Sequence, residues 1–398
     1  MSILSGTRVI LGVTGSIAAY KAADLASALT QAGVQVDVAL TRAAENFVTP
    51  MTFEAVTQRP VVTSETPMTR ENRVAHVEVG RSADAIVIAP ATASSIARLA
   101  FGLAEDPVTE MVLVSGAPLV VAPAMEPGMF AHPATQANLK ILRDRGVHVI
   151  PPDHGRLASG LVGQGRLPLK SVLLDALRLV LGRSGPLAGR TIVVSAGGTR
   201  EHLDPVRHIG NRSSGRQGIA LARAAMEQGA AVRLVLGAAT VTPPYGVDTS
   251  SVETTAEMLE ALSVATVGCD ALIMNAAIGD FRPAHYSPAK IKRRVATPIF
   301  ELEETPSLLK SLTGEFVRVA FAAETEDHEV NARQKLEELQ VDAVVVNDVG
   351  ASDRGFAAGT NAVTMISRSG QRREVALTSK EDVASAVLDL VQELLAAR

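Results

Sequence analysis

Short apolar runs alternate with longer amphipathic segments through the first half of the chain. Runs of Val, Ile, Leu and Ala predict strands at 8–13, 34–40, 86–89, 119–122 and 147–150. Ala- and Leu-rich stretches with helical spacing predict helices at 17–32, 93–103 and 134–145. This alternation predicts an α/β fold in which helices cover both faces of a doubly wound, mainly parallel sheet.

A second α/β pattern begins after a stretch that lacks periodicity. The segment GRSGPLAGR at 182–190 gathers Gly, Ser and Pro, as linkers and turns do. The strands predicted beyond it are 191–195, 231–236, 270–274, 316–321 and 342–346, and the helices are 215–228, 255–265, 328–339 and the tail from Lys380. We therefore predict two doubly wound domains, 1–189 and 190–398.

Composition narrows the class of protein. Of the 398 residues 47% are apolar but only 3% aromatic, so the cores must be built from Ala, Val, Leu and Ile. The net charge of −4 gives no field that would attract nucleic acid or anionic lipid. A lone cysteine, Cys269, excludes an internal disulfide and a Cys/His zinc site. With no signal-peptide pattern and no stretch long enough to span a membrane, we expect a soluble, cytoplasmic protein.

The turn after the first predicted strand resembles an anion cradle. GVTGSIAAYK at 12–21 places two glycines before a helix, whose free N–H groups suit an anion. The dinucleotide fingerprint is absent, and no acid follows the second strand to hold a ribose, which argues against NAD. Hydroxyl groups suited to the phosphate and ribityl chain of FMN are those of Ser16, Thr41, Thr92, Ser94 and Ser95. A strand–turn–helix without a ligand is the alternative.

Three other stretches of the first half carry candidate chemistry. His76 precedes the strand that leads into the APAT turn, and taken alone it is either an ordinary polar residue or a catalyst. VVAPAMEPGMF at 120–130 carries Glu126 directly after a strand. The glycine-rich segment 156–168 has the composition of a flexible loop that acts as a lid.

The second half contains a different anion-binding pattern. GNRSSGRQG at 210–218 offers backbone and hydroxyl donors just before a helix but lacks the lysine spacing of a P-loop. Asp280 follows a strand, where it can hold Mg²⁺ or a sugar hydroxyl. The basic run in PAKIKRR (288–294) is either a solvated loop or a group that neutralises a triphosphate. No aromatic residues interleave these charges, so nucleic acid is not expected as a partner.

Together these motifs resemble the bifunctional phosphopantothenoylcysteine decarboxylase/phosphopantothenate–cysteine ligase family of coenzyme A biosynthesis. GSIAAYK, the histidine followed by AD-IVIAPATA, and the PAM turn are similar to the flavin-dependent decarboxylase. AGGTRE-x-x-DPVR-x-I-x-NRSSG, DFRP, KIK, FAAET and ND (347–348) are similar to the CTP-dependent ligase. The resemblance implies a flavodoxin-like FMN domain followed by a Rossmann-like ligase domain.

The resemblance also implies two consecutive reactions. The ligase would activate 4′-phosphopantothenate with CTP and Mg²⁺ as an acyl-cytidylate, which the amine of cysteine then attacks. The decarboxylase would use FMN to oxidise the cysteinyl thiol, lose CO₂ and return the electrons, giving 4′-phosphopantetheine. The family further implies a homo-oligomer, with trimeric contacts between decarboxylase domains and dimeric contacts between ligase domains.

Roles for individual residues follow from the same resemblance. His76 would act as a base at the flavin, Asn211 would steady the acyl-cytidylate, and Lys290 would stabilise charge as pyrophosphate leaves. Implied FMN contacts are Gly15, Ser16, Ile17, Thr41, Thr92, Ser94, Ala124 and Met125; implied CTP contacts are Ala276, Asp280, Lys290, Phe321 and Lys335. No residue is assigned as a metal ligand.

Two positions depart from the decarboxylase pattern. Glu126 replaces the asparagine of PAMN, which holds the substrate carboxylate in the family, and an ionised glutamate would repel that group. Ser159 stands where many members carry a proton-donating cysteine, and a hydroxyl is far less acidic than a thiol of pKa about 8.5. The alternatives are an active ligase joined to a weakly active or scaffolding FMN domain, and a nucleotide sensor without turnover.

Overall fold

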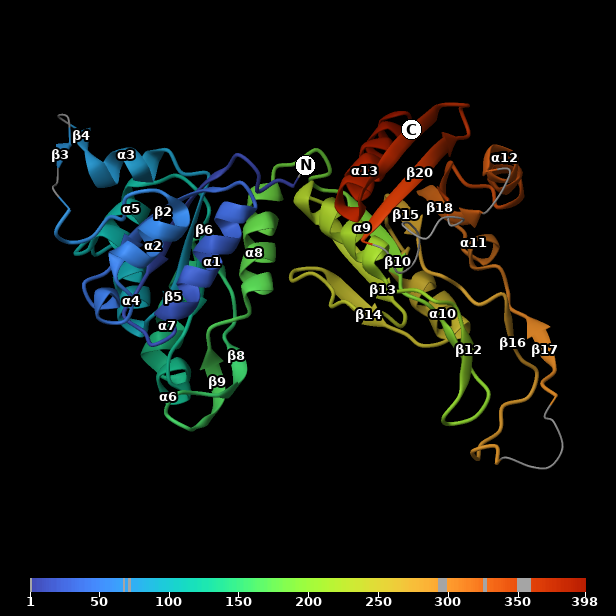
Figure 1. Cartoon of the computed structure of the whole chain (residues 1–398), viewed down its shortest axis with the longest axis horizontal. Helices are drawn as coiled ribbons and strands as arrows, with labels where there is room; N and C mark the ends of the chain where they lie inside the picture. The colour runs from blue at the N-terminus through green and yellow to red at the C-terminus, as the bar shows by residue number, and fades with distance from the viewer. Residues whose placement is uncertain (1, 67–68, 71–72, 293–298, 325–327, 349–358) are drawn as a thin grey trace. The chain divides into compact units, whose positions relative to one another are not determined.

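The computed structural model describes residues 2–66, 69–70, 73–292, 299–324, 328–348 and 359–398. The chain divides into two compact units, 2–182 and 183–398 (Figure 1). Each unit has its own sheet and its own buried core. The predicted fold class, two doubly wound and mainly parallel sheets, is confirmed.

The first unit is built on a five-stranded parallel sheet. Its strands, in spatial order, are β2 (Gln35–Leu40), β1 (Arg8–Val13), β5 (Ala85–Ala91), β6 (Leu119–Pro123) and β7 (His148–Val149). Every residue of β5 is buried, because helices cover both faces of the central strands. The strand order reverses between β1 and β5, as in flavodoxin-like folds, and ligands of such sheets bind at the carboxyl ends of the strands near this point.

Helices flank this sheet. They are α1 (Ala19–Gln31), α2 (Pro50–Thr57), α3 (Ala75–Arg81), α4 (Ala93–Phe101), α5 (Pro107–Val114), α6 (Pro127–Ala131), α7 (Pro133–Asp144) and α8 (Lys170–Gly182). Ile96 of α4, Met111 of α5 and Leu139 of α7 share one core cluster with Ile86 and Ile88 of β5. Helices α1 and α8 contact each other and β5. A short ribbon of two two-residue strands, β3 (Thr69–Arg70) and β4 (Arg73–Val74), precedes α3.

The glycine-rich segment that we predicted as a flexible loop forms much of a β-ribbon instead. Strand β8 (Asp153–Arg156) pairs with β9 (Val162–Arg166) in antiparallel register. A Cβ atom on Gly165 would lie 2.1 Å from the carbonyl oxygen of Met125, and one on Gly163 would lie 2.7 Å from Pro127. These two glycines therefore allow the ribbon to approach the end of β6 closely.

The second unit contains an eight-stranded sheet. Its spatial order is β14 (Asp248–Ser251), β13 (Ala231–Leu236), β10 (Thr191–Ala196), β15 (Ala271–Met274), β18 (Val317–Glu324), β19 (Ala343–Asp348), β20 (Thr360–Ser367) and β21 (Arg372–Ser379). The first six are parallel, and β20 and β21 join them in antiparallel pairing. The order reverses between β10 and β15, so this edge is the expected ligand side of a Rossmann-like sheet.

The helices of the second unit are α9 (Arg216–Glu227), α10 (Thr255–Ala265), α11 (Leu308–Ser311), α12 (His328–Glu338) and α13 (Lys380–Ala396). Helices α9 and α13 pack together, whereas α10, α11 and α12 contribute to a separate core cluster that contains Met258, Leu309 and Leu336. Two ribbons extend from the sheet: β11 (Arg200–His202) with β12 (His208–Gly210), and β16 (Phe281–Pro283) with β17 (Leu302–Glu304).

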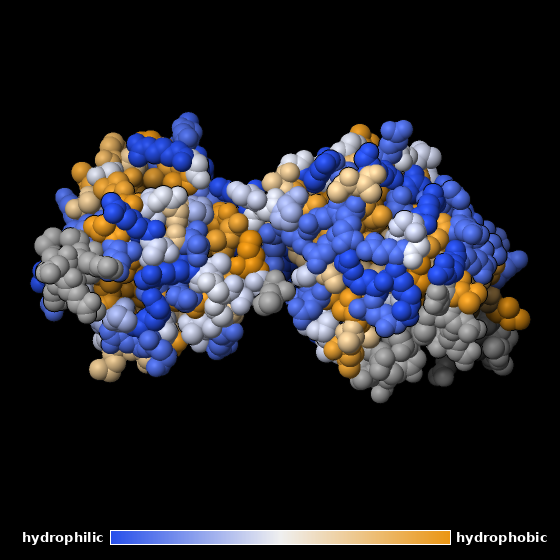
Figure 2. All heavy atoms as spheres, turned by 90° about the horizontal axis from the view of Figure 1, so that it is seen from above, coloured by the Kyte–Doolittle hydropathy of each residue, from blue (hydrophilic) through white to orange (hydrophobic). Residues whose placement is uncertain are grey.

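The surface is mixed in character. On the face drawn in Figure 2, apolar side chains lie as separate patches among polar ones on each unit. Among the helices of the described ranges, none combines the length and the apolar character that crossing a bilayer requires.

Candidate functional site

A cavity of about 560 Å³ opens at the carboxyl edge of the first sheet. Three segments enclose it: the turn and first residues of α1, the end of β6, and the β8–β9 ribbon. Its lining brings together six of the predicted residues, namely Ser16, Ile17, Ala124, Met125, Glu126 and Ser159. Met125 donates its backbone N–H to the carbonyl of Gly165 at 3.0 Å, which fixes the ribbon against the end of β6.

The two residues that depart from the family pattern contact each other in this cavity. Ser159 Oγ donates to Glu126 Oε1 at 3.1 Å. The other carboxylate oxygen, Oε2, accepts the backbone N–H of Gly128 at 3.3 Å and caps the start of α6. Glu126 thus holds both the tip of the ribbon and its own helix. Sequence reasoning singled out both positions but not their contact.

Three cationic side chains in the cavity wall were not predicted. Lys21 comes from α1, Arg156 from the end of β8 and Arg166 from the end of β9. None of the three is ion-paired within the described part of the chain. Because Glu126 is the single carboxylate of the lining, the cavity suits an anionic ligand. Lys21 lies inside the GSIAAYK motif, so the motif itself contained this signal.

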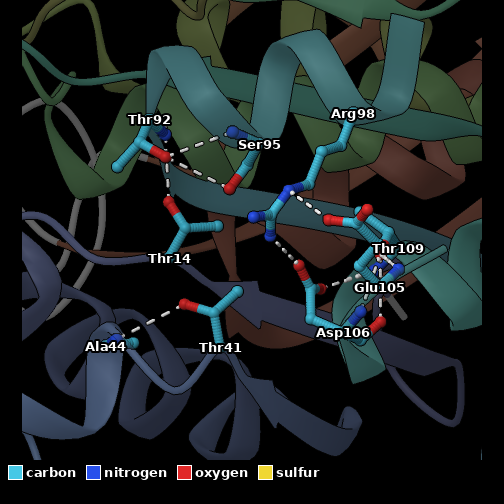
Figure 3. Close-up of polar contacts among 9 residues, drawn as sticks. All are labelled: Thr14, Thr41, Ala44, Thr92, Ser95, Arg98, Glu105, Asp106 and Thr109. Carbon is cyan, nitrogen blue, oxygen red and sulfur yellow. Dashed lines mark hydrogen bonds and ion pairs between the residues drawn. The ribbon is translucent and has the colours of Figure 1, made fainter. Parts of the chain in front are cut away.

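Two of the predicted hydroxyl groups bind the backbone at the switch point (Figure 3). Thr92 donates its N–H to Thr14 Oγ1 at 2.9 Å. Thr14 Oγ1 in turn donates to the carbonyl of Pro90 at 2.8 Å. Thr92 Oγ1 accepts the N–H of Ser95 at 3.3 Å and caps α4, while Thr41 Oγ1 accepts the N–H of Ala44 at 3.3 Å. These hydroxyls hold the turns at the edge of the sheet.

Several predicted FMN contacts do not line the cavity. These are Gly15, Thr41, Thr92 and the exposed Ser94. Gly15 has a packing reason for its identity, since a Cβ atom there would lie 2.4 Å from the Cβ atom of Ala43. It allows the turn before α1 to sit against the segment that follows β2.

His76 also lies outside the cavity lining, on α3, and has a carboxylate partner. Its Nδ1 is 3.4 Å from Glu110 Oε2, and both side chains are partly exposed. Glu110 lies one turn into α5, whose start is fixed by a capping box between Asp106 and Thr109 and by the 2.9 Å contact of Arg98 with Asp106 (Figure 3). Because Nδ1 faces Glu110, Nε2 is the nitrogen available as a base.

A second cavity, of about 470 Å³, opens at the carboxyl ends of β15 and β18. It brings together four of the predicted nucleotide contacts: Ala276, Asp280, Phe321 and Lys335. Thr305 donates its N–H to the carbonyl of Asp280 at 2.9 Å and its hydroxyl to the carbonyl of Gly279 at 2.6 Å, so the loop that carries the carboxylate is held in place. Apolar and charged groups thus meet in one cavity, as a nucleotide requires.

The GNRSSG turn is joined to this cavity by Asn211. Its side-chain Nδ2 donates to the carbonyl of Ile278 at 2.7 Å, and Ile278 lines the cavity. Thr199 supports the same loop, because its Oγ1 accepts the N–H of Gly279 at 2.9 Å and also contacts the hydroxyl of Thr255 at 3.1 Å. Thr199 lies inside the AGGTRE string, but nothing in the string indicated this supporting role.

Lys290, predicted as a nucleotide contact and catalytic group, is exposed and does not line this cavity. Arg293 and Arg294 of the same basic run, and Thr325 of FAAET, lie outside the described residues. Across the described ranges, no group of three or more His, Cys, Asp and Glu side chains is arranged to bind a metal ion.

Comparison with known proteins gives a family for each half of the chain. The family described as "Flavoprotein" matches residues 2–178, and the DNA/pantothenate metabolism flavoprotein C-terminal domain matches residues 187–395. The coenzyme A biosynthesis bifunctional protein CoaBC of Vibrio vulnificus is 39% identical over 401 residues, covering 99% of this chain and 100% of its own. That of Bacillus subtilis is 40% identical over 398 residues, covering 98% of each.

One solved structure, the C-terminal domain of a coenzyme A biosynthesis bifunctional protein CoaBC, is 34% identical and covers 54% of this chain and 100% of its own, with a TM-score of 0.47. The sequence identity to the Vibrio vulnificus and Bacillus subtilis relatives extends over both halves of the chain in order. The chain belongs to the family of bifunctional coenzyme A biosynthesis proteins CoaBC, as its motifs predicted.

Proposed function

We propose that this chain performs two consecutive steps of coenzyme A biosynthesis in the cytoplasm. It joins cysteine to 4′-phosphopantothenate with CTP, and it then decarboxylates 4′-phosphopantothenoylcysteine to 4′-phosphopantetheine with FMN. The observation that carries the proposal is the pair of cavities, each at the carboxyl edge of its own doubly wound sheet and each collecting predicted site residues.

In the ligase step, the carboxylate of 4′-phosphopantothenate attacks the α-phosphorus of CTP and pyrophosphate leaves. Phe321 and Lys335 would contact the nucleotide. Asp280 would accept a hydrogen bond from a sugar hydroxyl or lie near the Mg²⁺ that accompanies the triphosphate. Asn211 would orient the acyl-cytidylate from beside Ile278, and Lys290 would neutralise the departing pyrophosphate. The amine of cysteine then attacks the acyl carbon, CMP leaves, and the amide forms.

In the decarboxylase step, Ser16, Ile17, Ala124 and Met125 would hold the flavin in a cavity whose apolar and cationic lining fits a flavin ring and an anionic substrate. FMN, when bound, supplies the reversible two-electron oxidation that makes loss of CO₂ easy. His76 would accept a proton through Nε2, with Nδ1 facing Glu110.

The anionic groups of the substrate need counter-charges that Glu126 does not supply. We assign this task to Lys21, Arg156 and Arg166, which line the cavity. Ser159 would remain hydrogen-bonded to Glu126 and keep the ribbon tip near the bound substrate. A weakly active decarboxylase half remains the second candidate, because Glu126 and Ser159 replace the groups that the family uses.

We propose that the chain works as a homo-oligomer, with trimeric contacts through the first unit and dimeric contacts through the second. The position of His76 outside the lining of the first cavity supports this, because a base supplied by a neighbouring copy would complete the site. Sedimentation equilibrium tests it: a monomer at working concentrations would contradict it.

The function is tested by two assays on the purified protein. With CTP, Mg²⁺, 4′-phosphopantothenate and cysteine, we expect pyrophosphate and 4′-phosphopantothenoylcysteine; with the latter supplied directly, we expect CO₂ and 4′-phosphopantetheine by mass spectrometry. His76→Asn should abolish only the second reaction and Lys290→Gln should impair only the first. Absence of pyrophosphate would refute the ligase assignment. Bound flavin without 4′-phosphopantetheine would leave a ligase with a scaffolding partner domain.

A further inference from the structure

Asp204 is a buried carboxylate to which the proposed reaction assigns no role. Its side chain has no exposed surface. Oδ1 accepts the backbone N–H groups of Val206 and Arg207, each at 2.8 Å. Oδ2 accepts Arg207 Nη1 at 2.7 Å and the backbone N–H of Ile291 at 3.1 Å. A carboxylate is this deeply buried only where donors surround it, so these contacts decide its conformation.

The donors keep this carboxyl group ionised. Burial acts to raise the pKa of Asp204, but the N–H groups of Val206, Ile291 and Arg207, together with the Arg207 charge, outweigh it and hold the pKa below its ordinary value of 3.8. At neutral pH the group is therefore an anion with four hydrogen-bond donors.

The donors come from two segments that are far apart in sequence. One is the turn 203–207, which is closed by the N–H of Leu203 donating to the carbonyl of Arg207 at 2.9 Å. The other is the segment around Ile291, 87 residues later. Arg207 Nη1 also donates to the carbonyl of Ile291 at 3.0 Å, so both backbone groups of Ile291 bind the Asp204–Arg207 pair.

A further contact holds the same segment upstream. Ser287 donates its N–H to the carbonyl of Leu203 at 3.0 Å, and its hydroxyl donates to the carbonyl of Ala289 at 2.7 Å. The backbone from Ser287 to Ile291 is thus anchored on the turn 203–207 at both ends, while the side chains of Lys290 and Lys292 are exposed. The side chain of an exposed lysine is long and flexible, so the region that its ammonium group can reach is set by where its backbone is held.

We propose that Asp204 is a positioning residue of the ligase: with Arg207 it fixes the backbone of Ile291 and thereby presents Lys290 and Lys292 to the phosphates of the nucleotide. The inference rests on the proposed function through the role of Lys290. Asp204 itself would touch neither nucleotide nor substrate. Without the anchor, the lysines would sample many positions, and few of them would meet the charge that develops on pyrophosphate.

The kinetic test is a double-mutant cycle between D204N and K290Q on the full chain, with pyrophosphate release as the readout. We expect each single variant to slow release by about tenfold or more, and the double variant to be no slower than the slower single. D389N, the same change at an exposed position of α13, serves as the matched control and should leave release unchanged. Fully additive effects, or an unaffected D204N, would overturn the inference.

Limited proteolysis tests the anchor without reference to activity. Trypsin should cut after Lys290 or Lys292 about tenfold faster in D204N than in wild type or D389N, because the bound backbone must first detach before it fits a protease. Equal rates in all three would overturn the anchor. If D204N does not fold, D204E, which keeps the charge but displaces it, should show the same two changes more weakly.

Failure of the proposed function can be told apart from failure of this inference. A wild type that releases no pyrophosphate would refute the ligase assignment and, with it, the catalytic part of the inference, whatever trypsin shows. A wild type that releases pyrophosphate, combined with unchanged proteolysis of D204N, would refute the positioning role alone.

Discussion

Glu126 and Ser159, the two residues at which the first unit departs from its family, bind each other in the wall of the cavity. The serine hydroxyl donates to one carboxylate oxygen and the Gly128 N–H to the other. The sequence marks both positions as unusual, but it does not reveal the pairing, because the residues are 33 positions apart and belong to different elements. Their contact is a property of the fold that brings the ribbon to the end of β6.

The charge of Glu126 should weaken substrate binding. We predict that Glu126→Asn lowers the KM of the decarboxylase for 4′-phosphopantothenoylcysteine about fivefold, since like charges in a half-exposed site repel by about 1 kcal/mol. Steady-state formation of 4′-phosphopantetheine measures it. Glu65→Asn, the same substitution at an exposed residue that does not line the cavity, is the matched control. A KM that rises would mean that Glu126 contributes favourably to binding.

Cys269 should be unreactive in the folded protein. It is 8% exposed, and burial, aided by Asp270 and opposed by Arg233, raises the pKa of the thiol to about 11. A thiol with a raised pKa is protonated below that pH, so at pH 8 only about one molecule in a thousand carries the reactive thiolate. Ellman's reagent should therefore label the native protein very slowly and label one thiol per chain in urea. Rapid labelling without denaturant would contradict the buried position.

At the scale of elements, a strand could be predicted from the sequence where its apolar residues form a continuous run. The central strands β1, β5, β10 and β15 are almost entirely buried, so their sequences are nearly continuous apolar runs that predict strands directly. Strands β14 and β21 lie at the edges of the sheet and carry polar or charged residues, which gave no such signal. The ribbon β8–β9 has the composition of a loop because Gly163 and Gly165 are needed for its close approach to the end of β6.

The same logic explains which site residues could be found. Ser16, Ala124 to Glu126 and Ala276 to Asp280 follow predicted strands, and the ends of parallel strands gather at one edge of a sheet. Arg156 and Arg166 belong to the ribbon, whose position against the end of β6 depends on tertiary contacts that the sequence does not reveal. Asp204 was visible only as part of a motif, because its partner Ile291 lies 87 residues away.

The close contact between the ribbon and the end of β6 provides a prediction at this scale. Gly165→Ala would place a methyl group against the carbonyl oxygen of Met125, so the ribbon must move away from the end of β6. We expect a loss of about 1–3 kcal/mol in the free energy of unfolding, as for overpacked sites, and less flavin retained per chain. Thermal unfolding and the visible absorbance of the purified protein measure the two effects.

Gly116→Ala provides the matched control for this substitution. A Cβ atom at Gly116 meets no atom within 4 Å, and the backbone there is not left-handed. This variant should keep wild-type stability and flavin content. Equal behaviour of the two variants would mean that the ribbon is not held by close packing at Gly165.

At the scale of the whole molecule, the chain repeats one architectural solution. Each unit closes its own core, with Ile86 and Leu139 in the first and Met258 and Leu336 in the second. Each places a cavity at the carboxyl edge beside its strand reversal. The sequence predicted two doubly wound sheets because the strand–helix pattern restarts after residue 190. In the proposed function the product of the ligase step is the substrate of the decarboxylase step, so this intermediate must be transferred from one site to the other.

The separate cores predict that the units fold and act when divided. Cutting between Gly182 and Arg183 leaves both sheets and all the helices that cover them intact. We expect fragment 1–182 to purify with flavin and fragment 183–398 to release pyrophosphate from CTP. Mixed together, the two should form 4′-phosphopantetheine from 4′-phosphopantothenate, because the intermediate can diffuse between them. Mass spectrometry of the mixture follows this reaction.

The position of the cut supplies the control for this experiment. Division after Ala176 removes Leu177 and Val180 from the first core, each of which contributes about 1.5–3 kcal/mol by burial, and so fragment 1–176 should aggregate or lose flavin. If fragment 1–182 fails in the same way, the first unit depends on the second for its stability. If both fragments fold but their mixture makes no 4′-phosphopantetheine while the intact chain does, the intermediate must pass directly between covalently joined sites.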